Sequence, residues 1–161
     1  MATVNSRGKL TLSINPFVPK PFTPFQWLPM TALSIVEARL KKIREALHGE
    51  RGIEILIESP KEAYIQGVLA RGDRRLGQPL VECLEQGSLK ALKKSLNQAG
   101  LSEEFYLYHS REFNECLPWQ QLDMGLHHGY LQHELEKSRL LQATEPCWDG
   151  CRRCGVCAEG E

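Results

Sequence analysis

Hydrophobic and polar residues alternate in two short stretches of the chain. Residues 9–14 place Leu10, Leu12 and Ile14 on one face and Thr11 and Ser13 on the other, and residues 53–58 repeat the pattern with alternating isoleucines. A period of two is typical of a half-buried strand. The sequence therefore predicts two strands, about 40 residues apart.

Several longer segments have the period of a helix instead. Apolar residues recur at three- and four-residue steps from Leu33 to Leu47, after an S-x-x-E capping box at Ser34–Glu37 and before Gly49. A second helix is predicted from Ser59, with Pro60 at its first position, to about Ala70. Further short helices are expected at 79–85, 89–99 and 129–141, closed in part by Gly87 and Gly100, with a turn or helix at 102–108. In the last helix the inward residues should be Leu131, Leu135 and Leu140.

The segment 15–29 contains five prolines and cannot be a helix or a central strand. Aromatic residues lie between the prolines, so the segment should be a rigid extended loop that packs against something. It either covers one end of the core or forms the wall of a substrate or cofactor pocket. Lys20 and Thr23 are its charged and hydrogen-bonding groups.

These elements indicate a helix-rich α/β protein in three parts. Residues 1–50 hold the first strand, the proline-rich loop and a helix; residues 51–143 hold the second strand and the remaining helices; residues 144–161 form a cysteine-rich tail. Two strands are few for this many helices. The pattern is therefore that of the last part of an α/β domain rather than a complete one.

Charge and composition limit the kinds of partner and the cellular compartment that the sequence indicates. Twenty basic residues balance 20 acidic ones, which argues against bulk nucleic-acid binding. The sequence has no apolar run that would span a membrane and no signal-peptide core, so a cytoplasmic location is expected. Thiols stay reduced there, and clustered cysteines then indicate metal or redox chemistry rather than disulfides.

The tail has four cysteines in eleven residues, with the spacing C-x3-C-x2-C-x2-C: Cys147, Cys151, Cys154 and Cys157. Soft thiolate ligands favour zinc or an iron–sulfur cluster. Zinc sites usually join two short pairs across a longer spacer, whereas a compact run favours an iron–sulfur cluster, most simply [4Fe–4S]. Zinc stays open as the alternative. Whether all four cysteines bind one centre also stays open, since in such runs one cysteine can serve another site.

Residues around the cysteines suit an anionic centre. Arg152 and Arg153 would offset its negative charge, Gly150 and Gly155 would allow tight turns, and Trp148 could shield it. The isolated Cys83 and Cys116 are expected to be buried or neutral thiols. The histidines at 127, 128 and 133 are expected at the surface or in capping roles.

Four motifs together resemble one known family. They are LTLSINPFVPKPFTPFQW, LARGDRRLG, LPWQQLDMG and CxxxCxxCGxC, in this order over residues 9–157. They are similar to the C-terminal part of radical S-adenosylmethionine enzymes described as Fe–S oxidoreductases, which are often fused to a cobalamin-binding domain. The resemblance implies the end of a partial (β/α)6 barrel, followed by a helical extension and a cysteine-rich tail.

The resemblance also suggests where a ligand would lie. Barrel enzymes place their chemistry at the C-terminal ends of the strands, so Lys20 and Thr23 would face cofactor or substrate. Arg71, Asp73 and Arg74 of the RGDRR turn would form a cofactor-binding or substrate loop. Trp119 and Asp123 of LPWQQLD would belong to the extension, in structural or substrate contact.

The chain departs from this family in one large respect. The upstream half of the barrel, with its radical-generating cluster motif, is absent, and the C-x3-C-x2-C at Cys147–Cys154 lies too late in the chain to replace it. We therefore expect a catalytically incomplete C-terminal portion with an auxiliary iron–sulfur cluster, whose partner is the missing N-terminal half and which meets S-adenosylmethionine only in the complete enzyme. The alternatives are a binding or scaffold module with a structural zinc, and an independent electron carrier.

Overall fold

The computed structural model describes residues 8–84 and 88–157. In chain order the elements are β1 (Leu10–Ile14), η1 (Pro24–Trp27), α1 (Leu33–Ala46), β2 (Ile53–Ile57), α2 (Pro60–Arg71), η2 (Arg74–Leu76), α3 (Gly77–Leu84), α4 (Leu89–Gln98), η3 (Glu104–Tyr108) and α5 (Tyr130–Arg139). The fold is α/β and rich in helix, as the sequence predicts. Among the described residues, no helix has the length and apolar character needed to cross a membrane.

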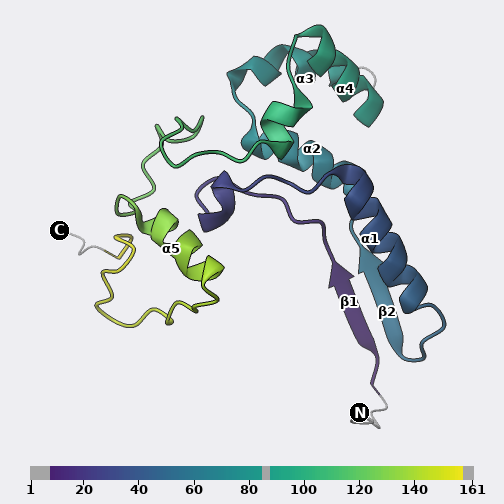
Figure 1. The fold of residues 1–161 in the computed structure, drawn as a ribbon, viewed down its shortest axis with the longest axis horizontal. Helices are drawn as coiled ribbons and strands as arrows, with labels where there is room; N and C mark the ends of the chain where they lie inside the picture. Colours follow the sequence, from purple (N-terminus) through teal and green to yellow (C-terminus); the bar gives the residue numbers. More distant parts are fainter. Residues whose placement is uncertain (1–7, 85–87, 158–161) are drawn as a thin grey trace.

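The two predicted strands form one parallel sheet. β1 pairs with β2 from Leu10 opposite Ile53 to Ile14 opposite Ile57, and α1 makes the crossover between them. None of the residues in either strand is fully buried, and Leu10 and Leu56 remain 55% and 53% exposed. Parallel sheets normally have both faces covered. Figure 1 shows this pair, with α1 beside it, projecting away from the other helices.

The starts of α1 and α2 differ in how well the sequence predicts them. The capping box expected at Ser34 is wrong: α1 begins at Leu33, its N-cap is Ala32, and no side chain caps it. The reason is that the helix begins two residues before Ile35, the start that a Ser34 cap would give, so the Ser34 side chain lies inside the first turn. The Ser59 cap is confirmed, since its side chain accepts a hydrogen bond from the Glu62 N–H and Pro60 is the first helical residue.

The main core lies where α2, α4 and η3 meet. Its buried members are Met30, Tyr64, Val68, Leu76, Leu92, Leu96, Tyr106 and Leu107. α2 can approach this closely because position 67 is glycine, where a β-carbon would meet the side chains of Met30 and Leu107. α3 and α4 confirm the predicted short helices; Gly87, expected to close the first, lies outside the described residues.

A second core joins the proline-rich segment to the C-terminal part of the chain. Trp27, Leu117, Trp119 and Leu135 are buried together. In Figure 1, η1 lies close to α5, at the side of the molecule away from the sheet. Leu135 is inward as predicted, but Leu140 is 67% exposed. That prediction is wrong because α5 ends at Arg139, so the helical period no longer applies to residue 140.

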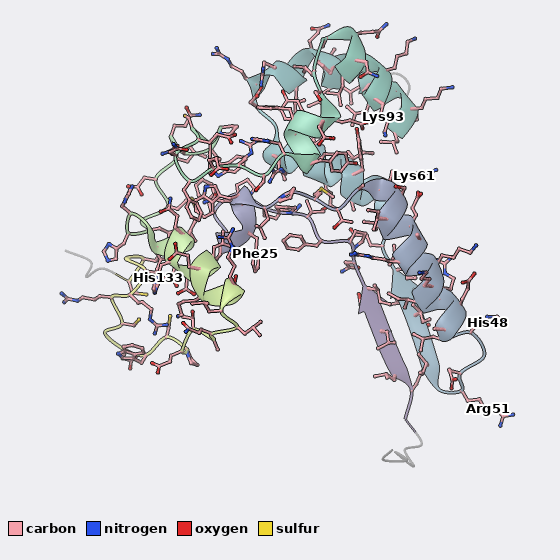
Figure 2. The ribbon with its side chains drawn as sticks, in the orientation of Figure 1. Phe25, His48, Arg51, Lys61, Lys93 and His133 are labelled. Carbon is pink, nitrogen blue, oxygen red and sulfur yellow. The ribbon has the colours of Figure 1, made fainter. Side chains whose placement is uncertain are left out.

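Figure 2 shows the sheet and the region around η1 and α5 again, now with their side chains. His48 and Arg51 mark the turn between α1 and β2, whereas Phe25 of η1 and His133 of α5 lie on the opposite part of the molecule. Lys61 is exposed at the start of α2, whereas Lys93 of α4 lies over the Tyr64 ring and pairs with Glu103. The proline-rich segment therefore connects an exposed sheet to the region that carries the cysteines.

Candidate functional site

The cysteine tail follows α5 and folds back on the segment that precedes this helix. Cys151 is buried, Cys154 is partly buried, and Cys147 and Cys157 are exposed. The negative charge of a Cys151 thiolate raises the pKa of Cys147 above its ordinary value, with smaller contributions from burial and from the other two cysteines. The four thiols therefore lie near enough to influence one another.

His127 fastens the tail to the residues before α5. Its backbone N–H donates a 2.8 Å hydrogen bond to the Cys154 carbonyl, and its ring Nε2 lies 3.1 Å from the Arg152 carbonyl oxygen. Gly155 packs against the same segment with φ of +94°, and a β-carbon there would lie 2.7 Å from the Gly125 carbonyl oxygen. Only glycine fits such a position without strain. His127 is thus a positioning residue, and its exposed ring, bound to a backbone carbonyl, agrees with the surface or capping role expected for it.

Arg153 is the charged partner of the tail. Its Nη2 lies 4.0 Å from the Cys151 sulfur, and its Nη1 donates a 2.7 Å hydrogen bond to the Glu145 carbonyl. The backbone N–H of Arg153, and then its guanidinium charge, lower the pKa of Cys151 against the opposing effect of burial. The guanidinium also lies over the Trp148 ring, 5.0 Å from its centroid. Trp148 itself is 58% exposed, so it covers Arg153 rather than the cysteines.

The donor chemistry of the tail fits a thiolate-bound metal or cluster, but its geometry is not assembled. Across residues 8–84 and 88–157, no three Cys, His, Asp or Glu side chains are arranged to hold a metal ion. Cys147 and Cys157 are the exposed members, so they can move without disrupting a core. Four thiolates would converge only if the tail rearranged around Cys151, which is held in place by burial and by Arg153.

The two polar residues of the proline-rich loop hold the loop itself. The Thr23 hydroxyl donates a 2.8 Å hydrogen bond to the Lys20 carbonyl, and Lys20 Nζ donates to Gln66 Oε1 of α2 at 3.1 Å. Neither residue lines a described cavity. Their expected contact with cofactor or substrate is therefore not reflected in the geometry.

Arg71 of the RGDRR turn is completely buried and unavailable to a ligand. Its guanidinium donates to four backbone carbonyls, those of Gln26, Leu28, Tyr106 and His109. Burial, and then the nearby charge of Arg111, lower the pKa of Arg71 to about 10. Arg111 in turn donates a 2.7 Å hydrogen bond to the Arg71 carbonyl. Arg71 therefore joins the last turn of α2 to η1 and to the end of η3.

Asp73 and Arg74 face a different surface. The Asp73 carboxylate accepts hydrogen bonds from Arg75 Nε at 3.0 Å and Nη2 at 2.7 Å, and the side-chain bond to Arg75 is the main cause of a lowered Asp73 pKa. Arg74 is exposed, and both residues line an open groove of about 1240 Å³ together with Trp119. The structure thus brings three sequence-predicted residues together and leaves Arg71 behind them in the core.

A smaller cavity of about 430 Å³ lies on the other side of the segment 117–122, between η1 and α5. Asp123 lines this cavity, as does His127, which holds the tail. Gln26 is buried beside it, and its Oε1 accepts a 2.7 Å hydrogen bond from the Trp119 indole. Asp123 and the groove residues are therefore separated by the wall that Trp119 forms.

Gln26 and Arg111 are site residues that the sequence did not predict, and His127 was expected only in a surface or capping role. No local pattern marks these contacts, because each residue is fixed by a partner more than 20 residues away. Arg71 did carry a signal: it follows Ala63 and Gly67 at four-residue steps, on the buried face of α2. Comparison of the chain with protein-family models, with curated proteins and with solved structures finds no match.

Proposed function

We propose that this chain is the C-terminal portion of a radical S-adenosylmethionine enzyme and carries an auxiliary iron–sulfur cluster on Cys147, Cys151, Cys154 and Cys157. The observation that supports this most directly is the compact run of thiols built around a buried Cys151, with Arg153 beside its sulfur. Compact cysteine runs with positive charge nearby suit an anionic cluster. The motif resemblance over residues 9–157 supplies the family.

Each residue of the tail has a definite part in this proposal. Cys151 is the fixed ligand, and its lowered pKa favours the thiolate that a metal requires. Arg153 offsets negative charge, and His127 holds the tail against the chain before α5. A bound cluster would supply electron transfer or an anchoring point for substrate. The chain's own residues supply its position and its electrostatic surroundings.

The two-stranded sheet supports the view that the chain is only part of the enzyme. β1 and β2 each have an unpaired edge within the described residues, and a parallel pair of this size is not stable on its own. We propose that the missing N-terminal barrel half, in the same or a separate chain, adds strands here. S-adenosylmethionine would then bind only in the complete enzyme, and this chain alone should be catalytically silent.

The experiment is a measurement of iron, zinc and acid-labile sulfide after anaerobic purification. Its matched variants are a quadruple alanine replacement at Cys147, Cys151, Cys154 and Cys157 and a double replacement at Cys83 and Cys116. We expect iron with equal sulfide in the natural chain and in the double variant, and neither in the quadruple variant. Production of 5′-deoxyadenosine by the isolated chain, above the quadruple variant, would contradict its catalytic incompleteness.

A structural zinc is the second candidate, and the packing of the tail favours it in one respect. The tail already binds the segment before α5 through His127 and Gly155, so a metal there could serve only to fix it. Stoichiometric zinc without sulfide, together with faster proteolysis of the tail after chelation, would indicate a structural zinc. The chain would then be a binding or scaffold module instead of a carrier of an iron–sulfur cluster.

A further inference from the structure

The cavity of about 430 Å³ between η1 and α5 has the character of a small-molecule site. Its volume lies within the range of about 300–1,000 Å³ that such sites occupy. Four aromatic side chains, those of Phe22, Trp27, Phe113 and Trp119, are among its walls. Flat aromatic walls favour a planar ligand, and glutamine, histidine and carboxylate side chains add hydrogen-bonding groups to the lining.

Trp27, one of the lining residues, has a buried hydrogen-bond donor without an acceptor among the described residues. Trp27 is 7% exposed, and its buried Nε1–H has no partner among the described residues. The equivalent donor of Trp119 is paired with Gln26 Oε1 at 2.7 Å. That oxygen also accepts from the Phe22 N–H, so it is not free for Trp27. A buried donor left unpaired is destabilising, and an acceptor on a ligand would remove that cost.

Phe113 is the side chain that would admit such a ligand. Its ring meets the Trp27 ring edge to face, with centroids 5.1 Å apart and planes at 88°. Phe113 is 39% exposed and lines the same cavity, so it can rotate outward without leaving a packed core. This rotation is needed because water does not reach the Trp27 nitrogen in the present arrangement.

The charges at the cavity select against anions. Glu115 and Asp123 line it, whereas its described lining contains no lysine or arginine. Glu115 is already ion-paired with Arg111 at 3.4 Å, so Asp123 is the carboxylate that would repel a bound carboxylate or phosphate. An N–H group on a ligand could instead donate to Asp123.

We infer that this cavity binds a neutral, planar heteroaromatic molecule that carries a carbonyl acceptor and an N–H donor, with the carbonyl accepting from Trp27 Nε1–H. The site goes beyond the proposed cluster function and needs no metal. His127 lines the cavity and also holds the cysteine tail, so the bound molecule would lie beside the candidate metal centre.

The test is a titration of the ¹⁵N-labelled chain, as isolated, with quinazolin-4-one, followed through the indole N–H signals of its three tryptophans. The Trp27 signal is identified by its loss in Trp27→Phe, which keeps an aromatic ring and removes the donor. We expect a saturable downfield shift of this signal. We also expect binding at least about fivefold weaker in Trp27→Phe, since a net hydrogen bond is lost. Trp148→Phe, outside the cavity, should bind as the natural chain does.

Two further measurements keep the outcome decisive if Trp27→Phe does not fold. Met124→Trp places bulk at an exposed position of the lining and should abolish the shift while leaving the core intact. Naphthalene-2-carboxylate, an anion of similar size, should bind at least about tenfold more weakly than quinazolin-4-one. An unmoved Trp27 signal, or equal affinity in Trp27→Phe, would overturn the inference. Because the readout is an indole signal, it is independent of whether the tail holds iron.

Discussion

The backbone N–H of His127 lies 2.8 Å from the carbonyl oxygen of Cys154, to which it donates a hydrogen bond. This bond joins the wall of the smaller cavity to the cysteine tail, because His127 lines the cavity and Cys154 belongs to the tail. A substitution that alters the cavity wall should therefore also alter the position of the cysteine tail, and a substitution in the tail should alter the cavity wall. The contact is made by the backbone, so its strength depends on the local chain conformation more than on the side chain at 127.

Gly155→Ala should detach the tail from this contact. At φ of +94° an added methyl group lies 2.7 Å from the Gly125 carbonyl oxygen and 3.0 Å from the His127 nitrogen. The left-handed conformation alone costs about 1–2 kcal/mol, which corresponds to roughly 5- to 30-fold faster exchange of the His127 amide hydrogen. Hydrogen exchange followed by mass spectrometry measures this.

Gly150→Ala is the matched control for that substitution. Its φ of +81° is also left-handed, but a β-carbon there meets nothing within 4 Å. The variant should show the conformational cost without the collision, and so a smaller change in exchange at His127. Equal effects of the two variants would show that the contact with residues 125–127 does not hold the tail.

Ser59→Ala should destabilise the fold, and Ser34→Ala should not. Ser59 accepts a hydrogen bond from the Glu62 N–H at the start of α2, whereas no side chain caps α1. Loss of an N-cap costs about 1 kcal/mol of unfolding free energy. Urea denaturation followed by circular dichroism measures the unfolding free energy of the two variants. A large loss of unfolding free energy in Ser34→Ala would show that Ser34 does cap α1.

Arg71→Lys should be far more disruptive than Arg74→Lys. A lysine cannot reach the four carbonyls that the buried guanidinium binds, and hydrogen bonds from charged groups each contribute about 1.5–3 kcal/mol. We expect a loss of about 3 kcal/mol for Arg71→Lys. Exposed Arg74 should change stability by no more than about 0.5 kcal/mol. The urea midpoints of the two variants measure the difference.

Asp73 should make stability depend on acid pH. Its folded-state pKa is lowered, chiefly by the hydrogen bond from Arg75, so the folded state binds this proton less readily than the unfolded chain. The contribution, about 1 kcal/mol for a partly exposed pair, is present above the ordinary pKa near 3.8 and is lost as the pH falls. The stability difference between the natural chain and Asp73→Asn should therefore shrink from pH 6 to pH 2. A difference that stays constant over this range would exclude the ion pair.

Ser13→Pro tests the open sheet edge. Leu10 N–H bonds to the Gly52 carbonyl, so by alternation the N–H of Ser13 points to the unpaired side of β1. If the edge drives self-association of the isolated chain, sedimentation velocity should show larger species as concentration rises, and fewer in Ser13→Pro. A natural chain that stays monomeric at every concentration would count against the incomplete sheet as a docking edge.

The sequence predicted the local elements well because their signals are local. The alternating isoleucines of β2 and the Ser59–Pro60 helix start act within a few residues, and both appear in the structure. The predicted Ser34 cap is wrong because helix starts two residues apart differ little in energy. The helical spacing of Arg71 indicates that it is buried, whereas the motif resemblance indicated that its charge contacts a ligand.

The candidate site was less predictable because it is made by contacts across the chain. Spacing identified the cysteines, but not their attachment to His127, nor the unequal burial of Cys147 and Cys151. The pairing of Trp119 with Gln26 spans 93 positions. No local pattern distinguishes that tryptophan from Trp27, whose donor has no partner among the described residues.

Arg71 also has a consequence for the order in which the chain acquires its structure. Its side chain is satisfied only when η1, α2 and η3 have met, across sequence separations of 35 to 45 residues. Before that meeting, closing α2 onto its neighbours would bury an unsatisfied cation. Helices can form early, but the compact state should appear late and in one cooperative step, at a rate limited by closing these long loops.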